Sequence, residues 1–216
     1  MPHASPKERA CHGVRFYQSR DPEIRALKRE HSPEGFGYRI WTSCWLLMEY
    51  LKDLRLPEGL RVMDVGCGWG LAGIYCAKAL GARVTAVDAD PEVFPFLRLH
   101  AELNDVGLTV VQRRLEDLTV ADLAGIDLLI GADICFWDEM LAPLLGLIDR
   151  ALQAGVGLIL IADPGRGSFH ALAQACAQRH DATTRSFYTL RPYPLQGRIL
   201  RVINPAEPTA APPRRA

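Results

Sequence analysis

Features that mark several classes of protein are missing from this sequence of 216 residues. Its six cysteines, at positions 11, 44, 67, 76, 135 and 176, include no Cys-x-x-Cys pair, which favours reduced thiols over a disulfide framework or a zinc site. No apolar run approaches the ~20 residues of a membrane span. Residues 1–10 lack the apolar stretch of a signal peptide. We therefore expect a cytoplasmic protein with no membrane partner.

The sequence also lacks a net charge of either sign. Lys and Arg together number 25, as do Asp and Glu, so no nucleic-acid partner is expected. The distribution is uneven, because residues 1–39 and the segment from Arg191 onward are basic and the middle is acidic. Basic ends are either solvated termini or a surface that orients an acidic partner. The sequence leaves the oligomeric state open.

What the sequence does have is an alternation of helical and strand-like segments. Helical periodicity or helix-start signals occur at 22–30, 40–54, 71–80, 91–104, 138–153 and 168–179, with Ser168 as a candidate N-cap. Short apolar segments typical of strands occur at 61–65, 83–88, 108–112, 126–131, 156–162, 182–190 and 197–203, the last two as a candidate hairpin. This order predicts an α/β domain with a parallel sheet and helices on both faces. We expect an N-terminal extension at 1–35, the domain at 36–204 and a disordered tail at 205–216.

A glycine-rich loop follows the first strand of this pattern. It reads Gly66-Cys67-Gly68-Trp69-Gly70, and the next strand ends about twenty residues later in Asp88. Glycines permit positive φ and close approach of a ligand, and the helix after the loop points free N–H groups at that ligand. A carboxylate at the end of the second strand suits hydrogen bonds to a ribose diol.

The same loop also satisfies the dinucleotide pattern G-x-G-x-x-G, which is weak evidence when it stands alone. Three observations disfavour a nicotinamide-dependent dehydrogenase. The glycines begin at Gly66, directly after the strand, and the length leaves little room for a separate substrate domain. Asp64 near the strand end would repel a pyrophosphate, whereas it would attract the ammonium of an amino acid.

The segment 62–70 resembles the first motif of the class I S-adenosyl-L-methionine-dependent methyltransferases, and 84–88 resembles their second. This resemblance implies a Rossmann-like, seven-stranded, mostly parallel sheet whose last strand is antiparallel. It also implies that Asp64 and the loop backbone hold the methionine portion of the cofactor and that Asp88 holds the ribose. Ala89 and Asp90 would border the adenine, and Glu116 or Asp117 would contact the adenine amino group. The cofactor-binding residues that we expect are Trp41, Asp64, Gly66, Cys67, Gly68, Gly70, Asp88, Ala89, Asp90, Glu116 and Ala132.

The acceptor side is expected after the fourth strand, at 131–139, where Asp133 precedes Phe136 and Trp137. This segment resembles the Asp-x-x-Tyr motif of methyltransferase family 16, which includes many protein-lysine methyltransferases, but phenylalanine replaces the tyrosine. The stretch 37–43 resembles the start of a helix that lies over the methionine end of the cofactor in that family, which makes Trp41 a candidate lid. The stretch 163–166, Asp-Pro-Gly-Arg, resembles the methyltransferases acting on lysines of the electron-transfer flavoprotein β subunit.

We therefore hypothesise that Asp133 and Phe136 are catalytic, Asp133 orienting the acceptor and taking its proton. Phe136 and Trp137 would wall the pocket, and Arg166 could hold an acidic group of the substrate. Structural alternatives stay open: Asp133 as a helix cap, Phe136 in core packing, Trp41 in a core stripe with Trp45, and 163–166 as an ordinary turn. His100 is interpreted as a surface residue, Cys67 and Cys135 as packing residues, and no metal site is expected.

These hypotheses give one preferred function and several alternatives. The preferred one is methylation of a protein lysine, with S-adenosyl-L-homocysteine as the other product. Methylation of a small amine or another metabolite is the second. A non-catalytic domain that binds the cofactor and acts through a partner is the third, and a nicotinamide-dependent oxidoreductase is a distant fourth.

Overall fold

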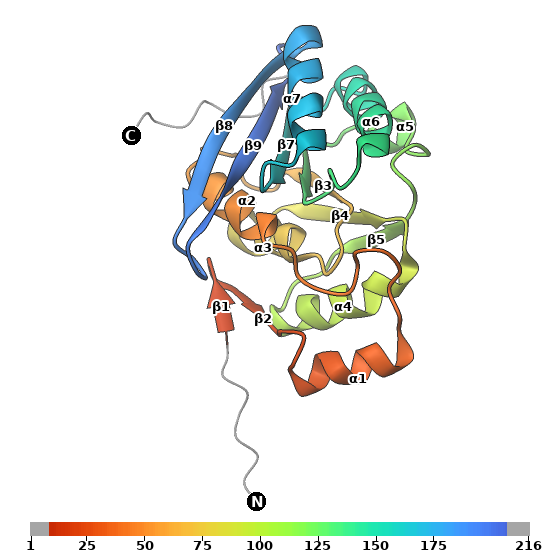
Figure 1. Ribbon diagram of the computed structural model, residues 1–216, viewed down its shortest axis with the longest axis vertical. Coiled ribbons are helices and arrows are strands. Elements are labelled where there is room, and N and C mark those ends of the chain that lie inside the picture. The colour runs from red at the N-terminus through yellow and green to blue at the C-terminus, as the bar shows by residue number, and fades with distance from the viewer. Residues whose placement is uncertain (1–8, 207–216) are drawn as a thin grey trace, which may run out of the picture.

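A computed structural model describes residues 9–206 of the chain (Figure 1). The predicted tail at 205–216 therefore lies almost wholly outside the described residues. The nine strands are β1 (Arg9–Cys11), β2 (Val14–Phe16), β3 (Arg61–Val65), β4 (Arg83–Asp88), β5 (Thr109–Gln112), β6 (Leu128–Ala132), β7 (Leu158–Asp163), β8 (Asp181–Thr189) and β9 (Leu195–Ile203) in the described part. The helices there are α1 (Pro22–Glu30), α2 (Ser43–Lys52), α3 (Leu71–Leu80), α4 (Phe94–Leu103), α5 (Val120–Leu123), α6 (Leu141–Gln153) and α7 (Gly167–Arg179), with short 3-10 turns at Pro91–Val93 and Asp138–Met140.

Seven strands form one sheet in the order β5-β4-β3-β6-β7-β9-β8. The pairs from β5 to β7 are parallel, and β9 runs antiparallel to both β7 and β8. The predicted fold class, a mostly parallel seven-stranded sheet with an antiparallel last strand, is thereby confirmed. β8 and β9 pair from Asp181 with Ile203 to Thr189 with Leu195, so they form the expected hairpin.

The sheet is buried on both faces because helices cover each of them (Figure 1). α2 and α3 pack with one apolar cluster, which includes Val62 and Leu128. α6 and α7 pack with a second cluster on the other face, which includes Leu129 and Ile159. Successive side chains of a strand point to opposite faces, so a strand such as β6 must be apolar throughout. This explains why the central strands appear in the sequence as continuous apolar runs.

The N-terminal segment is folded onto the domain. β1 and β2 form a small antiparallel hairpin, which the sequence reading missed because its strands have only three residues each. The side chain of Asn104, after α4, accepts from the Arg15 N–H at 2.8 Å and donates to the Arg15 carbonyl at 2.8 Å. The boundary at residue 35 stays a prediction. Within residues 9–206, no helix combines the length and apolar character needed to cross a membrane.

Three details of the sequence reading need correction. α2 begins at Ser43, so Trp41 precedes the helix and does not share a helical stripe with the buried Trp45. Arg166 occupies the N-cap position of α7, and Ser168 lies in its first turn with the hydroxyl donating to the Cys135 carbonyl at 2.6 Å. His100 is fully buried and not on the surface. One of its ring nitrogens lies 2.7 Å from the Phe96 carbonyl, and the other accepts the Tyr17 N–H.

Candidate cofactor and acceptor site

The glycine-rich loop lies between the carboxyl end of β3 and the start of α3. Gly66, Gly68 and Gly70 all have positive φ, at 61°, 52° and 73°, which is the conformation that glycine adopts without strain. A side chain at Gly66 would meet Ile134 within 2.6 Å, whereas one at Gly68 would meet no atom within 4 Å. The loop is therefore closed against the protein at Gly66 and open at Gly68, where the backbone can be approached by a ligand.

Asp64 is buried beneath this loop, near the end of β3. Its carboxylate accepts the Gly73 N–H of α3 at 3.0 Å. Burial raises the pKa of Asp64 from 3.8 to about 7, and the neighbouring Asp88 adds to this rise while the Gly73 hydrogen bond opposes it. The hydrogen bond from Gly73 offsets only part of the cost of burying this charge. A cationic ligand beside the carboxylate would stabilise its charged form. The ammonium group of an amino acid moiety is a ligand of that kind.

Asp88 closes the loop from the end of β4. One carboxylate oxygen accepts the Gly68 N–H at 2.9 Å, and the other accepts the Asp90 N–H at 3.1 Å. Burial raises the pKa of Asp88, although these backbone hydrogen bonds oppose the shift. Each carboxylate oxygen has a second acceptor site, so Asp88 still has acceptor capacity for hydroxyl groups.

Two adjoining cavities surround the loop. A small one of about 50 Å³ includes Asp64, Cys67 and Gly70 in its wall, and a larger one of about 220 Å³ includes Asp88, Ala89 and Asp90. Both cavities are bordered by the same four residues, Trp41, Gly66, Gly68 and Ala132.

The structure thus brings ten of the eleven predicted cofactor residues to these two cavities. The exception is Glu116, which is exposed and outside both walls, whereas Arg113 and Leu115 line the larger cavity. The loop after β5 contains a turn in which the Asp117 N–H donates to the Arg114 carbonyl, and the contact predicted for Glu116 or Asp117 with the adenine stays a prediction. The thiol of Cys67 has a raised pKa because of burial, which suits a neutral packing residue in the loop wall.

Asp133 follows β6 and is almost fully buried, with 2% of its surface exposed. Its φ of 59° is left-handed, a conformation that Asp and Asn tolerate better than most other residues with a side chain. One carboxylate oxygen accepts the Ser43 N–H at the start of α2 at 2.7 Å. The other lies 2.9 Å from a guanidinium nitrogen of Arg166. The first oxygen is therefore hydrogen-bonded, whereas the second is held by an ion pair and has no hydrogen-bond partner among the described residues.

Arg166 connects three elements of the acceptor side. The same guanidinium nitrogen that faces Asp133 donates to Asp163 at 2.6 Å, and Asp163 is fully buried at the end of β7. The guanidinium also lies over the ring of Phe136, 4.5 Å from its centre. Asp163 in turn accepts the backbone N–H groups of Gly165 and Arg166 at 2.8 Å each. The Asp-Pro-Gly-Arg segment is thus a tight turn that aims its arginine at the site.

Aromatic side chains form the mouth of the larger cavity. Phe136 and Trp137 line it as expected, and Trp137 is 53% exposed. Phe36, which the sequence reading did not single out, stacks on Phe136 with ring centres 3.8 Å apart. Trp41 donates from its indole nitrogen to the Phe36 carbonyl at 2.7 Å and meets the Phe136 ring edge-on. The only sequence signal for Phe36 is its position just before the Gly37–Ser43 segment.

Comparisons with known proteins agree with this arrangement. Residues 62–155 match the family model described as a methyltransferase domain. Over 140 residues the chain is 31% identical to the electron transfer flavoprotein beta subunit lysine methyltransferase of Xenopus laevis, covering 62% of this chain and 56% of that protein. It is 30% identical over 141 residues to protein N-lysine methyltransferase METTL21A of Danio rerio, covering 62% and 64%.

Other matches have different acceptors in their names. The chain is 39% identical over 80 residues to a ubiquinone biosynthesis O-methyltransferase of Xanthomonas axonopodis, covering 37% of this chain and 33% of that one. It therefore spans less than two thirds of the length of these relatives. Among solved structures, the precorrin-6y C5,15-methyltransferase of Geobacter metallireducens has a TM-score of 0.59 at 16% identity, covering 81% of this chain and 94% of that one.

The sheet order, the glycine-rich loop with its two carboxylates and the matches in sequence and structure define the class. The chain has the fold of the class I S-adenosylmethionine-dependent methyltransferases and is similar to them in sequence. Within this class it resembles the lysine methyltransferases represented by the Xenopus laevis and Danio rerio proteins.

Proposed function

We propose that this protein transfers a methyl group from S-adenosylmethionine to a lysine side chain of a protein. The observation that carries the proposal is that the loop cavity adjoins the cavity with the aromatic mouth, since Trp41, Gly66, Gly68 and Ala132 border both. The two lysine methyltransferases among the relatives support this acceptor class.

The two cavities together have the donors and acceptors that the cofactor requires. Asp64 would pair with the ammonium of the methionine portion, and the open backbone at Gly68 leaves room beside it. Asp88 would accept from the ribose hydroxyls, and the apolar wall at Val93 and Leu115 would contact the adenine. When bound, S-adenosylmethionine supplies a methyl group that is already activated by its positive sulfur, so the protein needs to align the acceptor and provide it with a free lone pair.

The contacts of Asp133 assign it a positioning role. Its carboxylate accepts the Ser43 N–H and forms an ion pair with Arg166, so it holds these two segments together. That Asp133 also takes the proton of the acceptor stays a hypothesis. Asp133 joins α2, β6 and Arg166 in the wall of the larger cavity.

The aromatic mouth suits an amine that must lose its charge before it attacks. A lysine amine has a reference pKa of ~10.4 in water, and burial among apolar rings lowers this pKa. Phe36, Phe136 and Trp137 supply such surroundings, and the long aliphatic stem of lysine can pack against aromatic rings. The proton would leave to solvent at the mouth, where Trp137 is exposed.

A small-molecule acceptor is the second candidate. It is favoured by the O-methyltransferase relative and by the phenyl ring of Phe136, which has no hydroxyl to hydrogen-bond an amine. The guanidinium of Arg166 lies outside both cavity walls but 4.5 Å from the centre of the Phe136 ring, where it could hold an anionic group of a metabolite.

A labelling experiment separates the two candidates. The purified protein is incubated with S-adenosylmethionine that carries a tritiated methyl group, together with either purified electron-transfer flavoprotein or a small-molecule cell extract. Label on a lysine of the protein acceptor, located by mass spectrometry, supports the proposal. The matched control is Gly68→Val, which adds a strained side chain in the cofactor cavity and should abolish labelling. Label found only in small molecules would reject the lysine assignment.

A further inference from the structure

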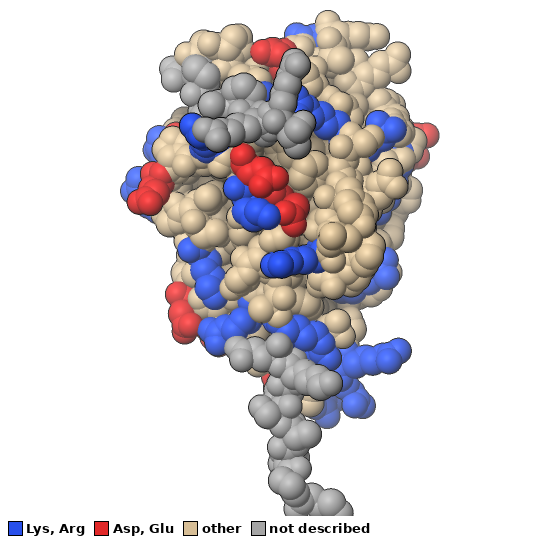
Figure 2. Space-filling model, turned by 90° about the vertical axis from the view of Figure 1, so that its left-hand side faces the viewer, with Lys and Arg blue, Asp and Glu red and all other residues tan. Residues whose placement is uncertain are grey.

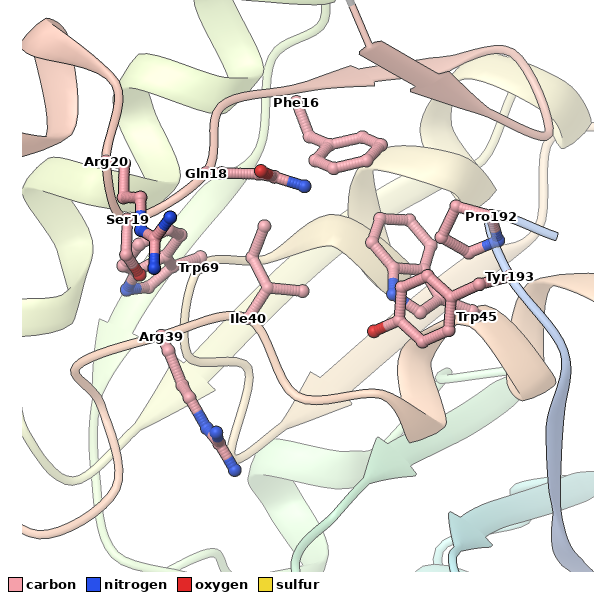
Figure 3. A pocket seen from close by; sticks show the side chains of 10 residues that line it. All are labelled: Phe16, Gln18, Ser19, Arg20, Arg39, Ile40, Trp45, Trp69, Pro192 and Tyr193. Atoms are coloured by element: carbon pink, nitrogen blue, oxygen red, sulfur yellow. The ribbon is translucent and has the colours of Figure 1, made fainter.

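A third cavity lies outside the cofactor and acceptor cleft, between the N-terminal segment and the β8–β9 hairpin. Its volume is about 290 Å³. Figure 3 shows its lining: Phe16 and Gln18 lie on one side, Trp45 and Tyr193 on another, and Ile40 lies near the centre. Arg20 and Ser19 lie near Trp69, and Arg39 lies on the opposite side from Phe16 (Figure 3). The wall thus combines large apolar rings with two cations.

The charge of this cavity is uncompensated. Its ten lining residues include no Asp or Glu. Arg20 is exposed and makes no ion pair with any residue in the range 9–206. Arg39 contacts only aromatic rings there, with its guanidinium 3.9 Å from the centre of the Trp41 ring. Further basic residues, Arg25 and Lys28, lie on the neighbouring α1.

The position of the cavity connects it to the methyl-transfer cleft. Arg39, Ile40 and Trp69 line both this cavity and the small cavity around the glycine loop. Lys and Arg side chains also gather toward the lower end of the molecule in the view of Figure 2, the end near β1 and α1. A chain segment held in the cavity would therefore lie beside the cofactor loop, on a basic part of the surface.

We propose that this cavity is a docking site for an acidic segment of the methyl-acceptor protein. The site pairs carboxylates of the segment with Arg20 and Arg39 and packs an adjacent apolar side chain against the exposed ring of Tyr193. Tyr, Trp and Arg are the residue types that dominate binding energy at protein interfaces. The proposal rests on the protein-lysine reading of the proposed function, because it assigns a second contact to that acceptor. It also gives the uneven charge of the sequence a role, since the basic N-terminal segment would orient an acidic partner.

Peptide binding tests the site independently of turnover. The probe is a short fluorescein-labelled peptide in which Asp alternates with Leu, and the comparison peptide has Asn in place of each Asp. Fluorescence anisotropy should show binding of the acidic peptide that weakens as salt is raised. Arg20→Glu should weaken this binding about tenfold, because an attraction to the carboxylates of the peptide is replaced by a repulsion. The affinity for S-adenosylmethionine should not change, since Arg20 lines neither cofactor cavity.

Two matched controls identify the cavity. Arg25→Glu makes the same charge change at another exposed arginine of the N-terminal segment, outside the cavity. Arg25→Glu should weaken binding less than about twofold, compared with about tenfold for Arg20→Glu. Tyr193→Ala should weaken binding, whereas Leu190→Ala, an exposed apolar residue of the same hairpin connection, should not.

Equal effects of Arg20→Glu and Arg25→Glu would overturn the docking site, because only the overall charge would then matter. Equal binding of the acidic and the Asn peptide would also overturn the docking site. Displacement of the acidic peptide by inorganic phosphate, or tighter binding of single-stranded RNA than of the acidic peptide, would overturn it as well. If the acidic peptide binds as described but no protein lysine is labelled, the docking site stands and the proposed lysine acceptor fails. If lysine labelling occurs and Arg20→Glu leaves the KM for that acceptor unchanged, the proposed lysine acceptor stands and the docking site fails.

Discussion

Replacing Asp64 by Asn should stabilise the folded protein at alkaline pH while weakening its binding of S-adenosylmethionine. Asp64 is 2% exposed, and burial raises its pKa from 3.8 to about 7. A carboxyl whose pKa is higher in the folded than in the unfolded state binds its proton more tightly when folded. The free energy of unfolding therefore falls as the pH rises from about 4 to about 7, and the full penalty remains above pH 7.

The size of this penalty follows from the two pKa values. A shift from 3.8 to about 7 corresponds to about 4 kcal/mol at 1.36 kcal/mol per unit. Asn removes the charge and keeps an oxygen for the Gly73 N–H. Its amide N–H groups then need partners in a buried place, which costs about 1–3 kcal/mol. We expect Asp64→Asn to be more stable than the native protein by about 1–3 kcal/mol at pH 8, and equal or less stable at pH 5.

Urea unfolding of the cofactor-free protein, followed by tryptophan fluorescence at both pH values, measures this difference. Asp117→Asn is the matched control, because Asp117 is exposed and its replacement should change stability by less than 0.5 kcal/mol. A gain from Asp64→Asn that is no larger at pH 8 than at pH 5 would refute the argument. Calorimetry should show at least a tenfold loss of affinity for S-adenosylmethionine, because the partner of its ammonium group is gone. Unchanged affinity would remove Asp64 from the proposed site.

Three further predictions concern the other parts of the cleft. Asp88→Ala should lower the affinity for S-adenosylmethionine at least tenfold, since it removes the acceptor for the ribose and frees the Gly68 N–H, and calorimetry with wild-type affinity would contradict this. Arg166→Ala should lower the free energy of unfolding by roughly 3 kcal/mol, because it leaves buried Asp133 and Asp163 without their cation. A free energy from urea unfolding within about 0.5 kcal/mol of the native value would be inconsistent with these ion pairs. Phe36→Ala should raise the KM of the acceptor several-fold with little change in cofactor affinity, and steady-state kinetics with an unchanged KM would exclude a role for Phe36 in the mouth.

Much of the fold could be predicted because its signals are local. The apolar runs of the buried strands, the Pro91 helix start and the Gly81 stop all depend on residues close in sequence, and the strand at Arg61–Val65 and the helix at Leu71–Leu80 have the predicted bounds. The short elements were missed for the opposite reason. The three-residue strands of β1 and β2 and the four-residue helix α5, which begins with a capping box between Thr119 and Asp122, are too short to show a period.

The cofactor loop was predictable because its glycines and carboxylates are close together in the chain. The acceptor side was not, because its geometry depends on segments far apart in sequence. Ser43 and Asp133 meet across 90 positions, and Phe36 stacks on Phe136. The sequence identified Asp133 and Arg166 separately, but their ion pair appears only when β6 and β7 lie side by side. His100 was misassigned for the same reason, since the Tyr17 backbone covers it from the N-terminal segment.

Under the proposed function, the left-handed backbone of Asp133 limits how this protein can acquire new acceptors. A β-branched or bulky side chain at that position would add backbone strain of about 1–3 kcal/mol. Loss of the carboxylate would also remove one of the two ion-pair partners of Arg166. Evolution of a different specificity is therefore confined to the ring of residues around Asp133 rather than to its centre. Phe36 and Trp137 can vary at low cost, because one lies in an N-terminal connection and the other is already half exposed to solvent. Homologues that share the Asp133–Arg166 pair should therefore differ at the positions of Phe36 and Trp137. Exchanging the residues at these two positions between two homologues should change the acceptor preference and leave the fold intact.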